Sequence, residues 1–171
     1  MNLNPTLSLR SLVPNDIDFL FKIENDENLW KYSNTKKSYS RSVLRDHIEN
    51  SKEDIFTAKQ QRFVLIDAES NIYGLIDLFD YDHQNSTASI GIVIAGEWRR
   101  KGYAKIGLKL LQKYAVKQLN LLQLYACVSI DNEPSRALFR AAGFKEKTNK
   151  MKKNQESEHT DMILLQKKIN A

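Results

Sequence analysis

The sequence has few of the residues that form disulfide frameworks and zinc sites. Cys127 is its only cysteine, and there are three histidines among 171 residues. A single cysteine cannot form an internal disulfide, and this small set of cysteine and histidine side chains argues against a structural zinc site. We therefore expect a protein without a bound metal.

The sequence also lacks a long hydrophobic run, an internal repeat and a low-complexity linker. Roughly 20 consecutive apolar residues are needed to cross a bilayer, and no run approaches that length. Residues 1–5 have neither the basic nor the apolar region of a secretory signal, so we expect a cytoplasmic protein that does not bind membranes.

The composition is that of one globular domain. With 42% hydrophobic and 27% charged residues, we expect a single domain spanning 1–171. The formal charge of +5 favours phosphate-bearing ligands but does not by itself indicate a nucleic-acid partner, and we expect none.

Hydrophobic periodicity and turn residues predict an α/β fold. Apolar segments predict strands at 7–13, 63–67, 73–79, 88–94, 123–129 and 161–166, with a short strand that begins at Phe144. Helical spacing predicts helices that begin at Asn15 or Asp16, at Ser40 or Ser42, near 103 and near 134, and end near 24, 52, 119 and 143. Segments 31–37 and 145–159 are polar and are predicted as loops. The order β-α-α-β-β-β-α-β-α-β-β combines antiparallel hairpins with one β-α-β crossover, which is typical of a mixed sheet with helices packed on it.

The segment from Ile90 to Lys105 is the most informative part of the sequence. An apolar strand is followed by the basic residues Arg99, Arg100 and Lys101, then by Gly102, and a helix begins at once. The first turn of a helix has backbone N–H groups without partners and carries partial positive charge. Glycine allows the backbone to approach a bulky anion. This order of elements predicts a phosphate or pyrophosphate site.

This segment has three alternative interpretations. Gly102, Ala104 and Gly107 have the spacing of a degenerate dinucleotide fingerprint, and Asp131 follows the next strand. Against a Rossmann fold, residues 96–101 separate the strand from the glycine, and no second nucleotide-binding half follows. A P-loop is weaker still because the sequence has no Gly-Lys-Ser/Thr triplet. The remaining alternative is a solvated basic turn, as most surface charge runs are.

Two blocks of the sequence carry a family resemblance. Residues 99–104, Arg-Arg-Lys-Gly-Tyr-Ala, match the signature Gln/Arg-x-x-Gly-x-Gly/Ala, and Asn132, a short helix and Gly143-Phe144 match a second block. In both, the sequence resembles the GNAT superfamily of acyl-CoA-dependent N-acetyltransferases, and the blocks occur in that family's order. A further resemblance is to the spermidine/diamine acetyltransferase branch, and it rests on residues 9–12, Asp16, residues 19–20 and residues 74–78. The same residues also fit the branch that acetylates ribosomal-protein N-termini.

This resemblance implies acetyl-CoA as the co-substrate. Its pyrophosphate would lie on the backbone N–H groups of the helix start, and its pantetheine would pair with the preceding strand, from which a bulge splays the next one. A free backbone N–H of Ile92 or Val93 would bind the thioester carbonyl and stabilise the oxyanion. The implied cofactor-binding residues are Ile92, Val93, Ile94, Arg99, Arg100, Lys101, Gly102, Tyr103, Ala104, Lys105, Asn132, Ser135, Phe139 and Arg140.

Fewer residues of the sequence point to the site of the amine that accepts the acetyl group. A neutral amine attacks the thioester and loses a proton, commonly to a carboxylate directly or through water. Asp77 lies near the end of a predicted strand and is our candidate for amine binding or for the base. Many family members have a tyrosine where this chain has Phe139, and the hydroxyl of that tyrosine protonates the departing thiolate. Tyr103, Tyr125 and Cys127 are the candidates to replace it.

We therefore expect an enzyme that transfers an acetyl group from acetyl-CoA to a primary amine, with a small polyamine or diamine such as spermidine as the acceptor. A protein N-terminus of the ribosomal type is the alternative acceptor. Because Phe139 replaces the tyrosine and Ser89 replaces a glutamate of related polyamine enzymes, a catalytically impaired CoA-binding regulatory module is the alternative of another class. The C-terminal strand offers an edge for pairing with a second copy in a homodimer.

Overall fold

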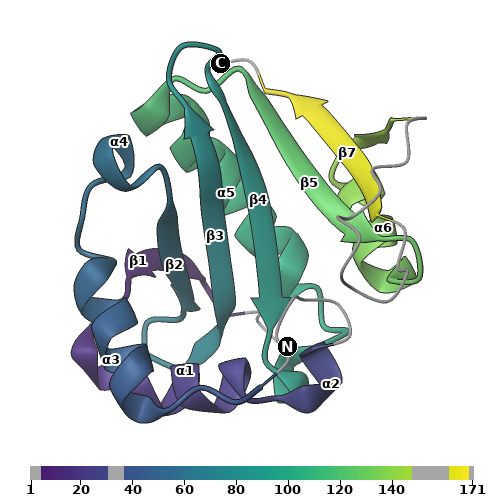
Figure 1. Cartoon of the computed structure of the whole chain (residues 1–171). Coiled ribbons are helices and arrows are strands. Elements are labelled where there is room, and N and C mark those ends of the chain that lie inside the picture. The colour runs from purple at the N-terminus through teal and green to yellow at the C-terminus, as the bar shows by residue number, and fades with distance from the viewer. Residues whose placement is uncertain (1–4, 31–36, 148–161, 170–171) are drawn as a thin grey trace.

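The structure is a computed structural model and describes residues 5–30, 37–147 and 162–169. In this part of the chain a seven-stranded sheet has the order β1-β2-β3-β4-β5-β7-β6 (Figure 1). Its strands are β1 Ser8–Ser11, β2 Gln61–Ile66, β3 Ile72–Asp82, β4 Thr87–Ile94, β5 Gln123–Ser129, β6 Lys145–Glu146 and β7 Met162–Lys168. Neighbouring strands are antiparallel except β4 and β5, which are parallel. The predicted α/β class with a mixed sheet is confirmed.

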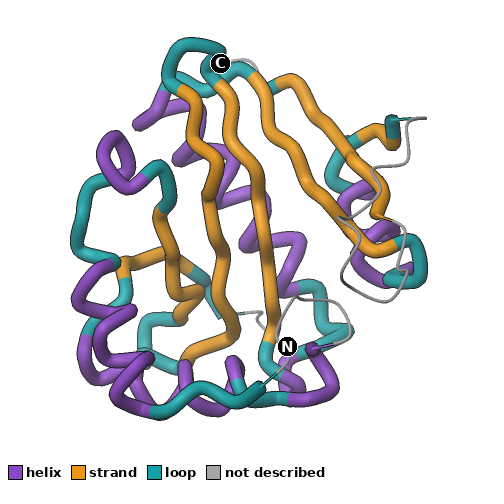
Figure 2. The backbone as a smooth tube through the Cα atoms, viewed as in Figure 1, coloured by secondary structure: helices purple, strands orange, loops and turns teal. Residues whose placement is uncertain are grey.

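Helices cover both faces of this sheet, as the tube in Figure 2 and the cartoon in Figure 1 show together. They are α1 Ile17–Glu24, α2 Glu27–Trp30, α3 Arg41–Asn50, α4 Ile55–Ala58, α5 Tyr103–Leu119 and α6 Glu133–Ala141, with 3-10 turns η1 Pro14–Asp16 and η2 Gly96–Trp98. Successive side chains of a strand point to opposite faces, so neighbours on β3 enter different cores. Leu75 packs with Leu20 of α1 and Ile48 of α3, whereas Ile76 packs with Leu108 of α5.

Several predicted elements are confirmed closely. α5 and β5 begin and end at the predicted residues. α3 begins after Ser40 rather than Ser42, because the Ser40 side chain accepts a hydrogen bond from the Val43 N–H at 3.2 Å. α2 and α4 were not predicted, since four residues are too few to show a helical period.

Other predicted details were wrong. β1 is shorter than 7–13, and β3 continues to Asp82 instead of ending at 79. Asp16 does not cap α1 through its side chain. Its buried carboxylate instead accepts hydrogen bonds from Arg10 at 2.7 and 2.8 Å and from the Val13 N–H at 2.9 Å, which ties β1 to the following turn. Residues 31–36 and 148–159 of the predicted loops, and Asp161 of the last strand, lie outside the described residues.

Candidate active site

The parallel strands β4 and β5 diverge along their length. They pair only through Thr87, Ala88 and Ser89 with residues 123–125, although β4 continues to Ile94 and β5 to Ser129. Figure 1 shows the gap between the two ribbons widening toward the carboxyl end of β4. The last part of β4 therefore has a sheet neighbour on the β3 side alone.

The alternation of backbone groups decides which amides of β4 face β5. The Ala95 N–H donates to the Tyr73 carbonyl at 2.9 Å, on the β3 side. Amides alternate in direction along a strand, so Val93 N–H also faces β3, and Ile92 N–H faces the opening. The Ile94 carbonyl, in phase with Ile92, accepts from Arg99 Nε at 2.9 Å instead of from β3. Of the two predicted oxyanion donors, the phase of the strand favours Ile92 and is against Val93.

The start of α5 lies at the carboxyl end of β4 and has the features of an anion site. No side chain caps its first turn, and that turn contains no acidic residue. Gly102 has φ +85° and Arg100 has φ +60°, so the chain turns sharply before the helix. A Cβ on Gly102 would meet no atom within 4 Å. The glycine is thus required for its backbone conformation and leaves open space beside unpaired helical N–H groups.

A cavity of about 580 Å³ joins the diverging strands to this helix start. Most of the predicted cofactor-binding residues line it: Ile92, Val93, Ile94, Arg99, Arg100, Gly102, Tyr103, Ala104, Lys105, Asn132 and Ser135. Five further lining residues were not predicted: Asn28, Leu29, Trp98, Pro134 and Leu138. Pro134 and Leu138 lie within the second motif block and Trp98 directly precedes the first, whereas the sequence gives no local signal that α2 would supply Asn28 and Leu29.

The two motif blocks thus meet in one cavity, and the family comparison agrees with this geometry. The family described as Acetyltransferase (GNAT) domain matches residues 6–145. The chain belongs to the GNAT acetyltransferase family. Spermidine N(1)-acetyltransferase of Vibrio cholerae is 29% identical to this acetyltransferase over 148 residues, covering 84% of this chain and 82% of the relative. The enzyme of the same name from Escherichia coli K12 is 27% identical over 139 residues, covering 81% and 73%.

Solved structures support the same relationship. The crystal structure of spermidine N-acetyltransferase from Vibrio cholerae, in complex with CoA and spermine, superposes with a TM-score of 0.84 at 25% identity and covers 95% of each chain. A dodecameric structure of spermidine N-acetyltransferase from Vibrio cholerae superposes with a TM-score of 0.76, covering 95% of this chain and 93% of that one.

Three predicted cofactor-binding residues of this acetyltransferase do not line the cavity. Lys101 places its Nζ 5.2 Å from the centre of the Trp98 ring. Phe139 is 2% exposed and packs edge-on against Phe144, with 5.1 Å between ring centres. Its ring is part of the hydrophobic core beneath α6, so the residue at the usual tyrosine position fills space here.

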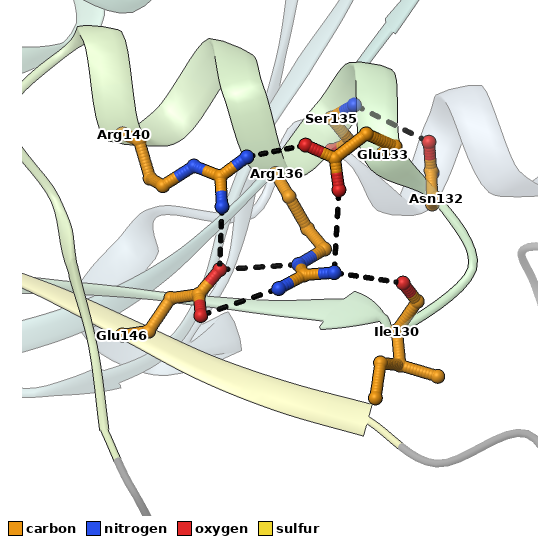
Figure 3. Close-up of polar contacts among 7 residues, drawn as sticks. All are labelled: Ile130, Asn132, Glu133, Ser135, Arg136, Arg140 and Glu146. Carbon is orange, nitrogen blue, oxygen red and sulfur yellow. Dashed lines mark hydrogen bonds and ion pairs between the residues drawn. The ribbon is translucent and has the colours of Figure 1, made fainter.

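Arg140, the third, belongs to an ion-pair network on α6 and β6 (Figure 3). Arg140 pairs with Glu133 and, at 3.4 Å, with Glu146. Arg136 pairs with the same two carboxylates at 3.2 and 3.1 Å and donates to the Ile130 carbonyl at 3.1 Å. The hydrogen bonds from Arg136 lower the pKa of Glu146. Arg140 is thus already paired with carboxylates, and phosphate binding by this residue stays a prediction.

Asn132 lies at the junction of β5 and α6. Its Oδ1 accepts a hydrogen bond from the Ser135 N–H at 3.3 Å and so caps α6 (Figure 3). Both residues also line the cavity. Asn132 therefore fixes the start of α6 at the cavity wall.

Asp77 lines a different cavity, of about 340 Å³, on the α3 side of the sheet. Both of its oxygens accept from Arg62, Oδ1 from Nε at 2.7 Å and Oδ2 from Nη2 at 2.9 Å, and Arg62 Nη1 donates to Glu24 at 2.7 Å. Burial would lower the pKa of Arg62, but the two carboxylates outweigh it and raise that pKa, so the guanidinium stays charged. One positive and two negative groups leave a net negative charge beside Gly91, which pairs with Asp77 across β3 and β4.

The described part of the chain has neither a membrane-spanning helix nor a cluster of metal-ligating side chains. No helix there is long and apolar enough to span a bilayer. No three His, Cys, Asp or Glu side chains there gather as metal ligands would.

Proposed function

We propose that this acetyltransferase transfers the acetyl group of acetyl-CoA to a primary amine of a small polyamine. The observation that carries the proposal is a single cavity lined by both the outward-facing backbone of Ile92 and the uncapped, basic start of α5. A donor with a pyrophosphate at one end and a thioester at the other fits these two features. The curated relatives named as spermidine N(1)-acetyltransferases support the choice of acceptor.

On the donor side, the pyrophosphate would accept hydrogen bonds from the first amides of α5, with added charge from Arg99, Arg100 and Lys105. The Ile92 N–H would donate to the thioester oxygen, where negative charge develops during attack. The departing thiol has an ordinary pKa of about 8.5, so a thiolate can leave near neutral pH without an acid at Phe139. Proton donation by Tyr103 is not needed for this step.

On the acceptor side, Asp77 would attract the cationic amine rather than take its proton. Each Asp77 oxygen already accepts a hydrogen bond from Arg62, while the group with Glu24 keeps a net negative charge. That charge lies next to Gly91, one residue before the proposed oxyanion donor Ile92. Deprotonation of the amine would then pass through water.

The test is CoA release from acetyl-CoA with a panel of amines. We expect turnover with spermidine, spermine or a short diamine and none with peptides that have a free N-terminus. Turnover with peptides alone would indicate that the acceptor is a protein N-terminus and not a polyamine. Tight CoA binding without turnover of any amine would instead indicate a CoA-binding module.

We expect Asp77→Asn to lower kcat/KM for the polyamine about tenfold, the size of an interaction of roughly 1.4 kcal/mol. The substitution keeps the shape of the side chain and removes the charge that would attract the amine. The KM for acetyl-CoA should stay unchanged in the same steady-state assay. Glu49→Gln, which removes an exposed carboxylate paired with Lys52, is the matched control and should change neither constant. An unchanged kcat/KM in Asp77→Asn would contradict the assignment.

We expect Gly102→Ala to raise the Kd for CoA about tenfold, since holding a residue with a Cβ at positive φ costs roughly 1–2 kcal/mol. No clash accompanies the change, so the effect should come from the conformation of the loop. Gly143 also has positive φ, +93°, but lies after α6. Gly143→Ala should lower the melting temperature without changing the Kd in calorimetry. Equal Kd values in all three proteins would rule out a role for the loop.

We also infer that the chain forms an oligomer, by analogy with the dodecameric relative. The expected homodimer is one such assembly, and light scattering of the purified protein distinguishes it from larger ones. The cytoplasmic location expected from the sequence stays a prediction.

A further inference from the structure

The aromatic side chain of Tyr73 lies beneath the basic loop, residues 96–102, that precedes α5. Tyr73 belongs to β3 and is only 3% exposed. Its hydroxyl donates to Asp67 Oδ2 at 3.0 Å, and its carbonyl accepts from the Ala95 N–H at 2.9 Å. The residue therefore contacts both the turn between β2 and β3 and the end of β4.

The Tyr73 ring also contacts both ends of the loop. The Trp98 ring lies 4.5 Å from it, centre to centre, at 35°, and the Tyr103 ring lies 4.6 Å from it at 64°. Trp98 and Tyr103 meet each other at 6.0 Å and 80°. These two residues bracket the chain from Arg99 to Gly102, and both line the 580 Å³ cavity. Such aromatic pairs contribute specific geometry in addition to their buried area.

The chain between Trp98 and Tyr103 has an unfavourable backbone conformation that neighbouring residues must stabilise. Arg100 and Gly102 both have positive φ, which is unfavourable for the arginine. Within the described chain, the loop's backbone N–H groups make only short local bonds, from Trp98 to Ala95 at 2.9 Å and from Arg99 to Gly96 at 3.4 Å. The three-ring contact, together with the hydrogen bond from Arg99 Nε to the Ile94 carbonyl, thus links the loop to the sheet.

Tyr73, the central residue of the three-ring contact, is itself fixed by burial and by its hydrogen bond to Asp67. Burial, and then the hydrogen bond to Asp67, raise the pKa of Tyr73 to about 12, so the phenol stays a neutral donor at physiological pH. Hydrogen bonds from Asn71, Tyr73 and the Glu69 N–H lower the pKa of Asp67, which stays an anion. A neutral hydroxyl that donates to a carboxylate makes a strong, directional bond.

We propose that Tyr73, anchored by Asp67, is a positioning residue that holds Trp98 and Tyr103 so that the loop between them keeps its donor-binding shape. The inference rests on the proposed function, in which this loop binds the pyrophosphate of acetyl-CoA. It also gives Tyr103 a structural place in the site in place of the acid role expected from the sequence.

The test compares Tyr73→Leu and Tyr73→Phe with Tyr81→Leu. Tyr81 is a buried tyrosine of the same strand, but its hydroxyl is near His83 and its ring packs on Phe56, away from the loop. We expect Tyr73→Leu to raise the Kd for CoA in calorimetry, and the KM for acetyl-CoA, by about tenfold. The kcat at saturating acetyl-CoA should stay within about twofold of the wild type, because the acetyl end of the cavity is unchanged. Tyr73→Phe keeps the rings and should restore most of the affinity.

Tyr81→Leu should lower the melting temperature without changing the Kd for CoA. The proposal is overturned if Tyr73→Leu keeps the wild-type Kd, or if Tyr81→Leu raises the Kd equally. Failure of the proposed function has a different result, since the wild-type protein would then either not bind CoA or bind it without transferring an acetyl group to any amine.

If Tyr73→Leu does not fold, Tyr73→Phe carries the test through the mobility of the Trp98 ring. Tyr73→Phe removes the hydrogen bond to Asp67 and should increase the acrylamide quenching of Trp98 fluorescence, measured in a Trp30→Phe background. Unchanged quenching would contradict the proposal.

Discussion

Replacing Gly74 by alanine is expected to lower the free energy of unfolding by about 3 kcal/mol, at the upper end of overpacking effects. A Cβ at this position would lie 2.2 Å from the Val93 carbonyl oxygen and 3.0–3.1 Å from atoms of Ile94. Its nearest neighbour is backbone, so no side-chain rotation relieves the clash, and β3 and β4 must separate. Urea denaturation at 25 °C measures the loss. The same displacement moves Ile94 at the cavity wall, so the affinity for CoA should fall with the stability.

Gly96→Ala is the matched control for this effect. A Cβ on Gly96 would meet no atom within 4 Å, and its φ is not positive. Its free energy of unfolding should therefore stay within about 0.5 kcal/mol of the wild type. Similar losses in the two variants would show that the close approach of β3 to β4 does not limit stability.

Replacing Arg62 by leucine is expected to cost about 3–5 kcal/mol, the usual penalty for removing one partner of a buried ion pair. The side chains of Arg62 and Glu24 are each 23% exposed and that of Asp77 is 28% exposed. Without the guanidinium, two carboxylates repel each other in a half-buried site where water replaces the lost bonds poorly. Equilibrium denaturation at pH 7 gives the size of the loss.

Two further measurements separate this cause from lost packing. Adding Glu24→Gln and Asp77→Asn to Arg62→Leu should recover part of the loss, because no unpaired charge then remains. Lys52→Ala, which breaks an exposed pair with Glu49, should change the stability by no more than about 0.5 kcal/mol. If the triple variant is no more stable than Arg62→Leu alone, packing by the arginine stem is the larger contribution.

The pKa of His47 depends on the charges of Arg62, Glu24 and Asp77. Burial, and after it the charge of Arg62, hold the pKa of His47 below its ordinary value, while Glu24 and Asp77 act in the opposite direction. Arg62→Leu removes a positive charge that lowers the pKa of His47 and keeps the two carboxylates that raise it. The pKa of His47 should therefore rise in this variant. A titration followed by NMR checks the direction of this change.

The parts of the fold that the sequence predicted best are those with a strong local signal. α5 has a long apolar face, with Leu108, Leu111 and Ala115 fully buried, and its start is marked by Gly102. β5 follows as an isolated apolar run. Four-residue helices such as α2 give no period, and so the contribution of Asn28 and Leu29 to the cavity depends on the tertiary fold alone.

The site shows the same division between local and long-range information. The uncapped, basic start of α5 follows from residues adjacent in sequence. The Arg62–Asp77 pair does not, although the register of the hairpin between β2 and β3 places the two residues opposite each other and could have suggested it. The preference for Ile92 over Val93 as oxyanion donor depends on which backbone N–H groups of β4 donate hydrogen bonds to β3, and no sequence pattern contains that information. Phe139 is the opposite case. The local motif predicts that it binds the cofactor, but the fold encloses its ring in the hydrophobic core.

On the proposed function, the narrow connection between β4 and β5 makes the donor a part of the sheet as well as a substrate. Three residue pairs join the strands β1–β4 to the strands β5–β7, and the remaining edge of β4 is open. A ligand that occupies this edge binds the folded chain and not the unfolded one, so it adds RT ln(1 + [L]/Kd) to stability, about 2.7 kcal/mol at a hundredfold excess over Kd. On the proposed function, the survival of this protein against unfolding and proteolysis would rise and fall with the supply of CoA and acetyl-CoA.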